Sequence, residues 1–311
     1  MEKTIRIKVI GVGGSGSNAV SRMAKCSIEG VELIAVNTDV QDLKTAKADQ
    51  KISIGKAITN GLGTGMNPAR AESAAEEDRE NLKNILKGAD LAFITCGMGG
   101  GTGTGAAPVI AEILKELGIL TVAVVTTPFS FEGRERSLIA SKGVDKLRDR
   151  VDTLITVSND KIFKLIDSKT SVDSAFWMCD EVLRQAVQGI SDLIVLPGIV
   201  NIDFADVKAI LKNSGSALFG IGRAQGDNRA KEAALAALNS PLIDVSSNKA
   251  KGVLFSVSGG EDISLAEIDE IAKVIKDRVS SDAKIIFGAV QDEKLKNGEI
   301  KVTIVATGFQ T

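Results

Sequence analysis

The chain has 311 residues, and its 38 lysines and arginines nearly balance its 40 aspartates and glutamates, giving a formal net charge of −2. At about 150 residues per domain this length favours two domains, and the balanced charge argues against nucleic-acid or direct membrane binding. Hydrophobic residues make up 44%, as in soluble globular proteins. No apolar run approaches the roughly 20 residues of a membrane helix, and the start has no signal-peptide pattern. We expect a cytoplasmic protein.

The residue types that the sequence lacks narrow its chemistry. It has no histidine, which excludes Ser-His-Asp and Cys-His catalysis and every metal site that needs a histidine ligand. Its three cysteines, Cys26, Cys96 and Cys179, form no CxxC pair, so neither a disulfide framework nor a zinc ribbon is predicted. Its 31 glycines exceed the usual share of about 7%, and we therefore looked at where they cluster.

The first half alternates predicted strands and helices. The strands are Thr4–Val12, Val31–Asn37, Lys51–Ile54, Asp90–Cys96, Leu120–Thr127 and Thr153–Ser158. The helices between them are Asn18–Cys26, Pro68–Leu86, Ala106–Leu117 and Glu135–Arg150. Apolar strands with spacers of helix length predict a Rossmann-like α/β domain, with a parallel sheet covered on both faces.

The second half has a different pattern. Apolar residues from Val172 to Ile194 recur at spacings of three and four, which predicts a long central helix that ends at Pro197-Gly198. Three shorter helices, Asp203–Lys212, Asn228–Leu238 and Leu265–Val279, and four strands, Ala217–Ile221, Gly252–Val257, Ile285–Val290 and Glu299–Ala306, follow. Asn297-Gly298 predicts a hairpin between the last two strands, and hence an α+β domain.

Three glycine-rich segments are candidate phosphate loops. Gly11–Gly16 satisfies GxGxxG between a strand and a helix, which indicates a nucleotide phosphate site or, alternatively, a tight turn. Gly99–Gly105 has five glycines in seven residues, at a high cost in conformational entropy, and favours a nest for a polyphosphate. Asn60–Gly65 is the third loop. Together they predict a triphosphate site, and without GxxxxGK[ST] the chain is not a P-loop NTPase.

The sequence GGGTGTG at Gly99–Gly105 resembles the signature loop of the tubulin/FtsZ family, in its bacterial cell-division form. Further matching segments are Gly11–Val20, Ala35–Asp39, Thr126–Arg136, Ser158–Lys161, Ala175–Leu183 and Asn201–Asp206. The resemblance implies a GTP-binding domain over residues 1–170, a central helix and the start of the synergy loop over 171–200, and a C-terminal domain over 201–311. It also implies head-to-tail, GTP-dependent filaments in the mid-cell division ring.

The resemblance further implies residues that bind GTP or GDP, with Mg²⁺ accompanying the phosphates. They are Gly14, Ser15, Gly16, Ser17, Asn18, Gly63, Thr64, Gly101, Thr102, Gly103, Glu132, Arg136, Asn159, Phe176 and Asp180. A phenyl ring can stack on a purine, and a carboxylate accepts from the N1–H and N2–H₂ of guanine. Without the resemblance, Glu132 and Arg136 would be read as a solvated i,i+4 pair and Phe176 as core.

The same resemblance places Asn201, Asp203 and Asp206 in a loop that completes the pocket of the next subunit, where the carboxylates orient the attacking water. On spacing alone, Asp203 as N-cap with Asp206 in the first turn of a helix is a good alternative. Assembly would then stimulate hydrolysis, since each active site needs two subunits.

Four residues depart from the family pattern: Trp177 and Cys179 stand where Arg and Ala are usual, and Ser15 and Thr64 where Gly and Ala are usual. The family's C-terminal tail, which binds membrane-tethering division proteins, is absent from this sequence. We expect the chain itself to be its main partner.

Two other functions compete with a cytoskeletal GTPase. GxGxxG together with Asp39, about 20 residues beyond Gly16, is typical of a nicotinamide-dependent oxidoreductase, but a dinucleotide fold does not use the second glycine loop. A structural homologue that does not hydrolyse GTP is the other alternative, and the intact Asn201–Asp206 segment argues against it.

Overall fold

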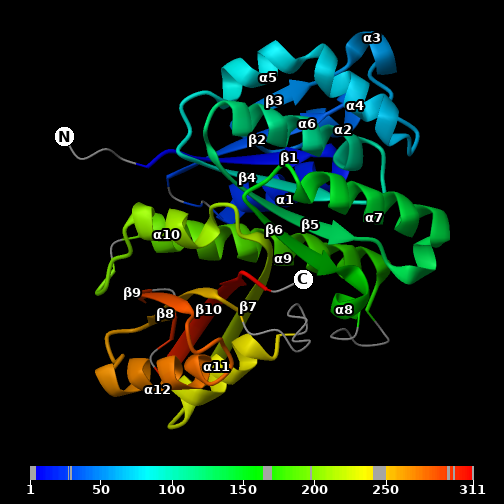
Figure 1. The fold of residues 1–311 in the computed structure, drawn as a ribbon. Coiled ribbons are helices and arrows are strands. Elements are labelled where there is room, and N and C mark those ends of the chain that lie inside the picture. The colour runs from blue at the N-terminus through cyan, green and yellow to red at the C-terminus, as the bar shows by residue number, and fades with distance from the viewer. Residues whose placement is uncertain are drawn as a thin grey trace. The chain divides into compact units, whose positions relative to one another are not determined.

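The computed structural model describes residues 5–26, 28, 30–163, 170–196, 198–240, 250–292, 295–296 and 298–309 (Figure 1). The chain divides into two compact units, Met1–Gln188 and Gly189–Thr311. The division falls within helix α9 (Val172–Val195), the helix that the sequence predicts between two domains. None of the helices in the described ranges is long and apolar enough to cross a lipid bilayer.

The first unit is built on a parallel sheet with the strand order β3-β2-β1-β4-β5-β6. Its strands are β1 (Ile7–Val12), β2 (Val31–Asn37), β3 (Gln50–Ser53), β4 (Leu91–Gly97), β5 (Leu120–Thr127) and β6 (Thr153–Ser158). The central strand β1 is buried along its whole length, as expected where helices cover both faces. The predicted Rossmann-like sheet is therefore confirmed.

This strand order has a switch point between β1 and β4. From β1 the chain moves outward through β2 to β3, and it then returns to place β4 on the other side of β1. In open parallel sheets a crevice forms at such a point, outside the carboxyl ends of the strands. Two of the three glycine-rich loops directly follow β1 and β4, so the topology brings them together.

The helices of the first unit connect these strands. They are α1 (Gly13–Cys26), α2 (Val40–Thr45), α3 (Lys56–Thr59), α4 (Pro68–Glu77), α5 (Arg79–Leu86), α6 (Thr102–Glu116), the short 3₁₀ helix η1 (Ser130–Glu132), α7 (Arg134–Arg148) and α8 (Asn159–Phe163). The prediction of a single helix over Pro68–Leu86 was wrong, because the helix is interrupted at Asp78, which separates α4 from α5. The Asp78 carboxylate accepts from the amide of Gly55 at 2.7 Å.

Helices α1 and α6 begin earlier than the sequence predicts. Their first turns contain glycines, which have a low helix propensity and were therefore assigned to loops. The close packing of these turns explains the glycines: a Cβ at Gly16 would lie 2.5 Å from the Thr95 carbonyl oxygen of β4. Tertiary packing thus outweighs intrinsic propensity here.

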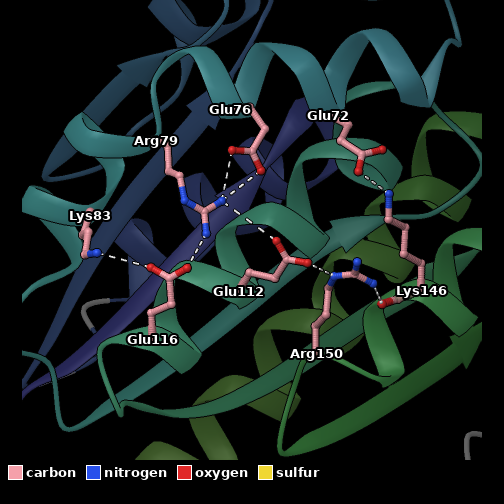
Figure 2. Close-up of polar contacts among 8 residues, drawn as sticks. All are labelled: Glu72, Glu76, Arg79, Lys83, Glu112, Glu116, Lys146 and Arg150. Carbon is pink, nitrogen blue, oxygen red and sulfur yellow. Dashed lines mark hydrogen bonds and ion pairs between the residues drawn. The ribbon is translucent and has the colours of Figure 1, made fainter.

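A network of charged side chains joins α6 to the helices beside it (Figure 2). Arg79 of α5 lies 2.6 Å from Glu116 and 3.9 Å from Glu112, both on α6. The remaining pairs are Arg79 with Glu76, Lys83 with Glu116, Arg150 with Glu112 and Lys146 with Glu72. Exposed ion pairs are individually weak, but a network over α4, α5, α6 and the end of α7 restrains α6 from several sides.

The second unit contains a four-stranded sheet of order β7-β10-β8-β9. Its strands are β7 (Gly215–Gln225), β8 (Gly252–Gly259), β9 (Lys284–Gln291) and β10 (Glu299–Thr307), and its helices after α9 are α10 (Phe204–Leu211), α11 (Arg229–Leu238) and α12 (Leu265–Lys276). β10 is antiparallel to both of its neighbours, whereas β8 and β9 are parallel. The predicted α+β class is confirmed.

The hairpin predicted between the last two strands was wrong. β10 lies between β7 and β8, and β9 pairs with β8 at the end of this order. Burial explains the difference, because β10 is mostly buried while β9 exposes Lys284 and Phe287. The turn residue Asn297, and Pro197 at the end of the central helix, lie outside the described residues.

Candidate functional site

The candidate site is a cavity where the N-termini of α1 and α6 meet at the switch point of the first sheet. β1 and β4 are paired there, with Gly11 opposite Thr95. The first amides of a helix have no partners within the helix, and its dipole places positive potential at that end. Two such ends beside one cavity give it a surface suited to an anion such as phosphate.

Glycine allows the two loops to approach each other closely. Gly13, at φ +73°, lies where a Cβ would be 3.0 Å from the Gly103 amide nitrogen. The hydroxyls of Thr38, after β2, and Thr102, at the start of α6, are 2.7 Å apart. Gly99 donates its amide to the Thr104 hydroxyl at 3.0 Å. These contacts hold the two loops against each other.

The third glycine-rich loop reaches the same cavity through Thr64. A Cβ on Gly101 would lie 1.9 Å from the Thr64 hydroxyl oxygen, so these loops are in direct contact. Asn67 caps α4 by accepting from the Arg70 amide at 3.1 Å, which fixes the end of the loop. All three predicted phosphate loops thus meet at one cavity.

Glu132 and Arg136 form one side of the cavity. Arg136 lies 2.9 Å from Glu132, whose side chain is only 9% exposed and also accepts from the Phe129 amide at 2.8 Å. The alternative of a solvated pair is therefore wrong for the carboxylate. The buried Nε of Arg136 has no hydrogen-bond partner in the structure, so it has a donor left for a ligand.

A second buried polar atom without a hydrogen-bond partner, after Arg136 Nε, is the side-chain Oδ1 of Asn159 at the start of α8. Phe176 on α9 is 41% exposed, and its ring packs edge-on against Phe129 at 5.4 Å. The interpretation of Phe176 as core is therefore wrong, because much of the ring is free to contact a flat ligand.

Asp180 lies one turn after Phe176 and is 7% exposed. Its carboxylate accepts from the Arg22 Nε at 3.2 Å. Burial raises the pKa of Asp180 to about 6, although Arg22 opposes the shift. Its neighbour Cys179 also lines the cavity. Burial raises the pKa of this thiol to about 12, so the thiol stays protonated and packs as a neutral side chain and not as a nucleophile.

Most of the predicted nucleotide-binding residues line this cavity. Those that line it are Gly14, Ser15, Thr64, Gly101, Thr102, Gly103, Glu132, Arg136, Asn159, Phe176 and Asp180. Those that do not are Gly16, Ser17, Asn18 and Gly63. Gly16 packs on β4, the Ser17 hydroxyl is buried, Asn18 is exposed, and Gly63 lies beside Asp39.

Sequence reasoning missed several lining residues. They are Val12, Gly13, Gly97, Met98, Gly100, Thr126, Pro128 and Cys179. Gly13 and Gly100 belong to the loops already singled out, and Thr126 and Pro128 to the segment before Glu132. Gly97 is the last residue of β4 and Met98 follows it, at the carboxyl end of a parallel strand, where ligand-binding residues are expected.

Asn201, Asp203 and Asp206 belong to the second unit. Asn201 accepts from the Gly198 amide at 2.7 Å. Asp203 has the backbone position of an N-cap for α10, but its carboxylate makes no capping hydrogen bond. Asp206, in the first turn, is exposed. The capping alternative therefore holds for the backbone of Asp203 and not for its side chain.

Over the described ranges, no group of three or more acidic or cysteine side chains is placed to hold a metal ion.

Comparison with known proteins gives independent information. Residues 6–167 match the sequence model of the "Tubulin/FtsZ family, GTPase domain", and residues 215–310 match that of the "FtsZ family, C-terminal domain". Among solved structures, an empty FtsZ dimer of M. jannaschii is 46% identical, with a TM-score of 0.94 over 99% of this chain and 89% of that chain. A point mutant of that protein matches equally well over 92% of its length.

More distant structures share the fold. CetZ2 of Haloferax volcanii, in a GTPγS-bound protofilament, is 21% identical, with a TM-score of 0.83 over 98% of this chain and 94% of that one. CetZ1 of the same organism, a GDP-bound monomer, is 21% identical, with a TM-score of 0.86.

Proposed function

This chain belongs to the tubulin/FtsZ family of GTPases, and we propose that it polymerises with GTP into head-to-tail filaments of the cell-division ring. The observation that carries the proposal is the single cavity that receives two helix N-termini and two buried polar atoms without partners, Arg136 Nε and Asn159 Oδ1. Membership of this GTPase family contradicts the alternative hypothesis of a nicotinamide-dependent oxidoreductase.

We propose that the two helix ends bind the nucleotide phosphates. The amides of Gly14 and Ser15 on α1 and of Gly101–Gly103 on α6 would donate to the phosphate oxygens, and Thr64 and Thr102 add hydroxyls. The four predicted residues that do not line the cavity would determine the shape of the loops; they are Gly16, Ser17, Asn18 and Gly63. Mg²⁺ would be held chiefly by the phosphates, where it offsets their negative charge.

The other side of the cavity suits a guanine nucleoside. The exposed face of Phe176 would stack on the base, and Asp180 would accept from N1–H and N2–H₂, which adenine does not offer as a donor pair. Glu132 and Arg136 would contact ribose and phosphate. Asn159 would meet the base O6 or the sugar.

Hydrolysis would require a second subunit. Asn201, Asp203 and Asp206 of one copy would complete the pocket of the next and orient the attacking water. The exposed carboxylate of Asp206, and that of Asp203 without a capping bond, leave these groups available. The FtsZ dimer of M. jannaschii, which is 46% identical to this chain, supports self-association. Assembly would therefore stimulate GTP turnover at the mid-cell ring in the cytoplasm.

The test is to identify the nucleotide that co-purifies with the protein and then to measure GTP turnover at increasing protein concentration. We expect guanine nucleotide, and a rate per subunit that rises as subunits associate. Bound nicotinamide dinucleotide would contradict the proposal, and a rate per subunit that does not change with concentration would contradict a shared active site.

A further inference from the structure

Asp180 of the cavity wall forms an ion pair with Arg22, a residue to which none of the roles above is assigned. Arg22, on α1, donates from Nε to Oδ2 of Asp180 at 3.2 Å, and the two side chains are 24% and 10% exposed. The first turn of α1 lines the phosphate end of the cavity, and Arg22 lies two turns further along the helix. The helix α1 therefore lines the cavity with its first turn and, through Arg22, also contacts Asp180.

Trp177 holds the same arginine from another direction. The guanidinium carbon of Arg22 lies 5.2 Å from the centroid of the Trp177 ring. Trp177 and Asp180 are three residues apart on α9, so they project from one side of the helix. A guanidinium can lie over an aromatic face while it donates in its own plane, so both contacts restrain Arg22 together.

We propose that Arg22 is a positioning residue of the guanine subsite, which holds Asp180 as an ionised and fixed acceptor for the base, and that Trp177 holds Arg22 in place. This inference rests on the proposed function, because it assumes that the base lies against Asp180. The two oxygens of a carboxylate have about four acceptor positions, so a bond to Arg22 still leaves room for N1–H and N2–H₂. A protonated Asp180 would present its own donor to them.

Among the charged groups around Asp180, Arg22 is the one that stabilises its ionised form. Burial raises the pKa of Asp180, and Arg22 is the group that lowers it. Of the other charged groups nearby, Glu132 of η1 is paired with Arg136 of α7, and Glu181 of α9 is paired with Arg184, also of α9. The thiol of Cys179 is neutral at physiological pH. Loss of Arg22 should therefore raise the pKa of Asp180 further and make it protonate at a higher pH.

The experiment uses the full chain and the variants Arg22→Gln, Arg22→Lys and Trp177→Leu. Arg148→Gln is the matched control, because Arg148 forms an exposed ion pair with Asp145 elsewhere on the unit. Calorimetry would give the affinities for GDP and for IDP, whose base lacks the N2 amino group, at about pH 8 and about pH 6. Comparison with wild type removes the effect of the titrating nucleotide phosphates. Thermal unfolding without nucleotide verifies that each variant is folded.

For Arg22→Gln we expect a loss of about fivefold in GDP affinity at pH 6 beyond that of wild type, since a rise of about one unit from a pKa of about 6 lowers the ionised fraction of Asp180 at that pH about fivefold. We also expect a smaller ratio of GDP to IDP affinity. Arg22→Lys should keep the wild-type pH dependence, and Trp177→Leu should reduce the ratio without changing that dependence. Arg148→Gln should match wild type.

Arg22→Gln with the affinities, ratio and pH dependence of wild type would overturn the inference while leaving GTP binding intact. Arg22→Lys with the pH dependence of Arg22→Gln would show that the charge is not what matters. An unchanged ratio in Trp177→Leu would remove Trp177 from the role. If wild type itself fails to bind GDP, the proposed function fails instead.

Discussion

Gly105 of α6 packs so closely on Pro68 of α4 that a Cβ on Gly105 would lie 2.0 Å from the Pro68 carbonyl oxygen. The same Cβ would lie 2.8 Å from the Ala71 methyl group. The last glycine of the signature loop thus serves the contact between two helices, and it is absent from the cavity lining. The glycine-rich loop therefore divides into a part that lines the cavity, Gly100–Gly103, and a part that packs against α4.

Gly105→Ala should destabilise the protein. The added methyl group meets backbone on one side and a buried alanine on the other, so α4 and α6 must move apart. Overpacking of this kind costs about 1–3 kcal/mol of the free energy of unfolding. Denaturant unfolding without nucleotide would measure it.

Gly100→Ala is the control, because it makes the same substitution in the same loop where a Cβ would meet nothing within 4 Å. Its stability should equal that of wild type or rise slightly, since alanine restricts the unfolded chain. Equal destabilisation of both variants would mean that the loop needs glycine for its backbone and not for packing.

The strands and the order of domains could be predicted because their signals are local. The apolar run Leu120–Thr127 forms β5 with the predicted bounds, since a strand covered on both faces needs apolar residues throughout. The starts of α1 and α6 could not be predicted, because glycines favour loops unless a neighbouring strand requires close approach. Such approach is a tertiary property.

The predicted hairpin between the last two strands was wrong for a related reason. Asn-Gly is a local signal for a hairpin, but the place of a strand in a sheet depends on how much of it must be buried. In the candidate site, the glycine loops and the i,i+4 spacing of Phe176 and Asp180 were visible in the sequence. The pairing of Arg22 with Asp180 joins residues 158 apart, and no local pattern contains it.

Asp180→Ala should weaken GTP binding by about 1–3 kcal/mol, because the donors on the base would then be buried without a partner. ATP binding should be weak in wild type and in the variant alike. Titration of both proteins with both nucleotides would measure the difference. Equal GTP affinity in the two proteins would remove Asp180 from the site.

Assembly should depend on GTP, Mg²⁺ and protein concentration. A head-to-tail contact does not close on itself, so it yields filaments and not dimers. Light scattering should rise above a threshold concentration and decay as GTP is consumed. Residues 1–311 should suffice for assembly, because we expect the filament contacts to lie within the two domains. A protein that binds GTP but stays monomeric at every concentration would contradict this prediction.

Asp206→Ala tests whether the loop after the central helix is catalytic. The Asp206 carboxylate is exposed, and Asp203 makes no capping bond, so the loss of stability should be at most the ~1 kcal/mol of a helix cap. The variant should bind GTP and assemble normally but turn GTP over far more slowly. Its filaments should then outlast those of wild type in a scattering experiment. Normal turnover would return Asp206 to a structural role.

Mixing Asp206→Ala with Asp180→Ala shows whether the loop acts across the filament contact. Asp206→Ala has an intact nucleotide pocket, and Asp180→Ala has an intact Asn201–Asp206 loop. A contact in which the loop of Asp180→Ala meets the pocket of Asp206→Ala therefore contains a complete active site. Some GTP turnover should therefore return in the mixture, beyond the sum of the two variants alone. Co-sedimentation of distinguishable copies would verify that both enter the same filaments. Confirmed mixed filaments without any gain in turnover would contradict a shared active site, because the complete contacts would then be present and inactive.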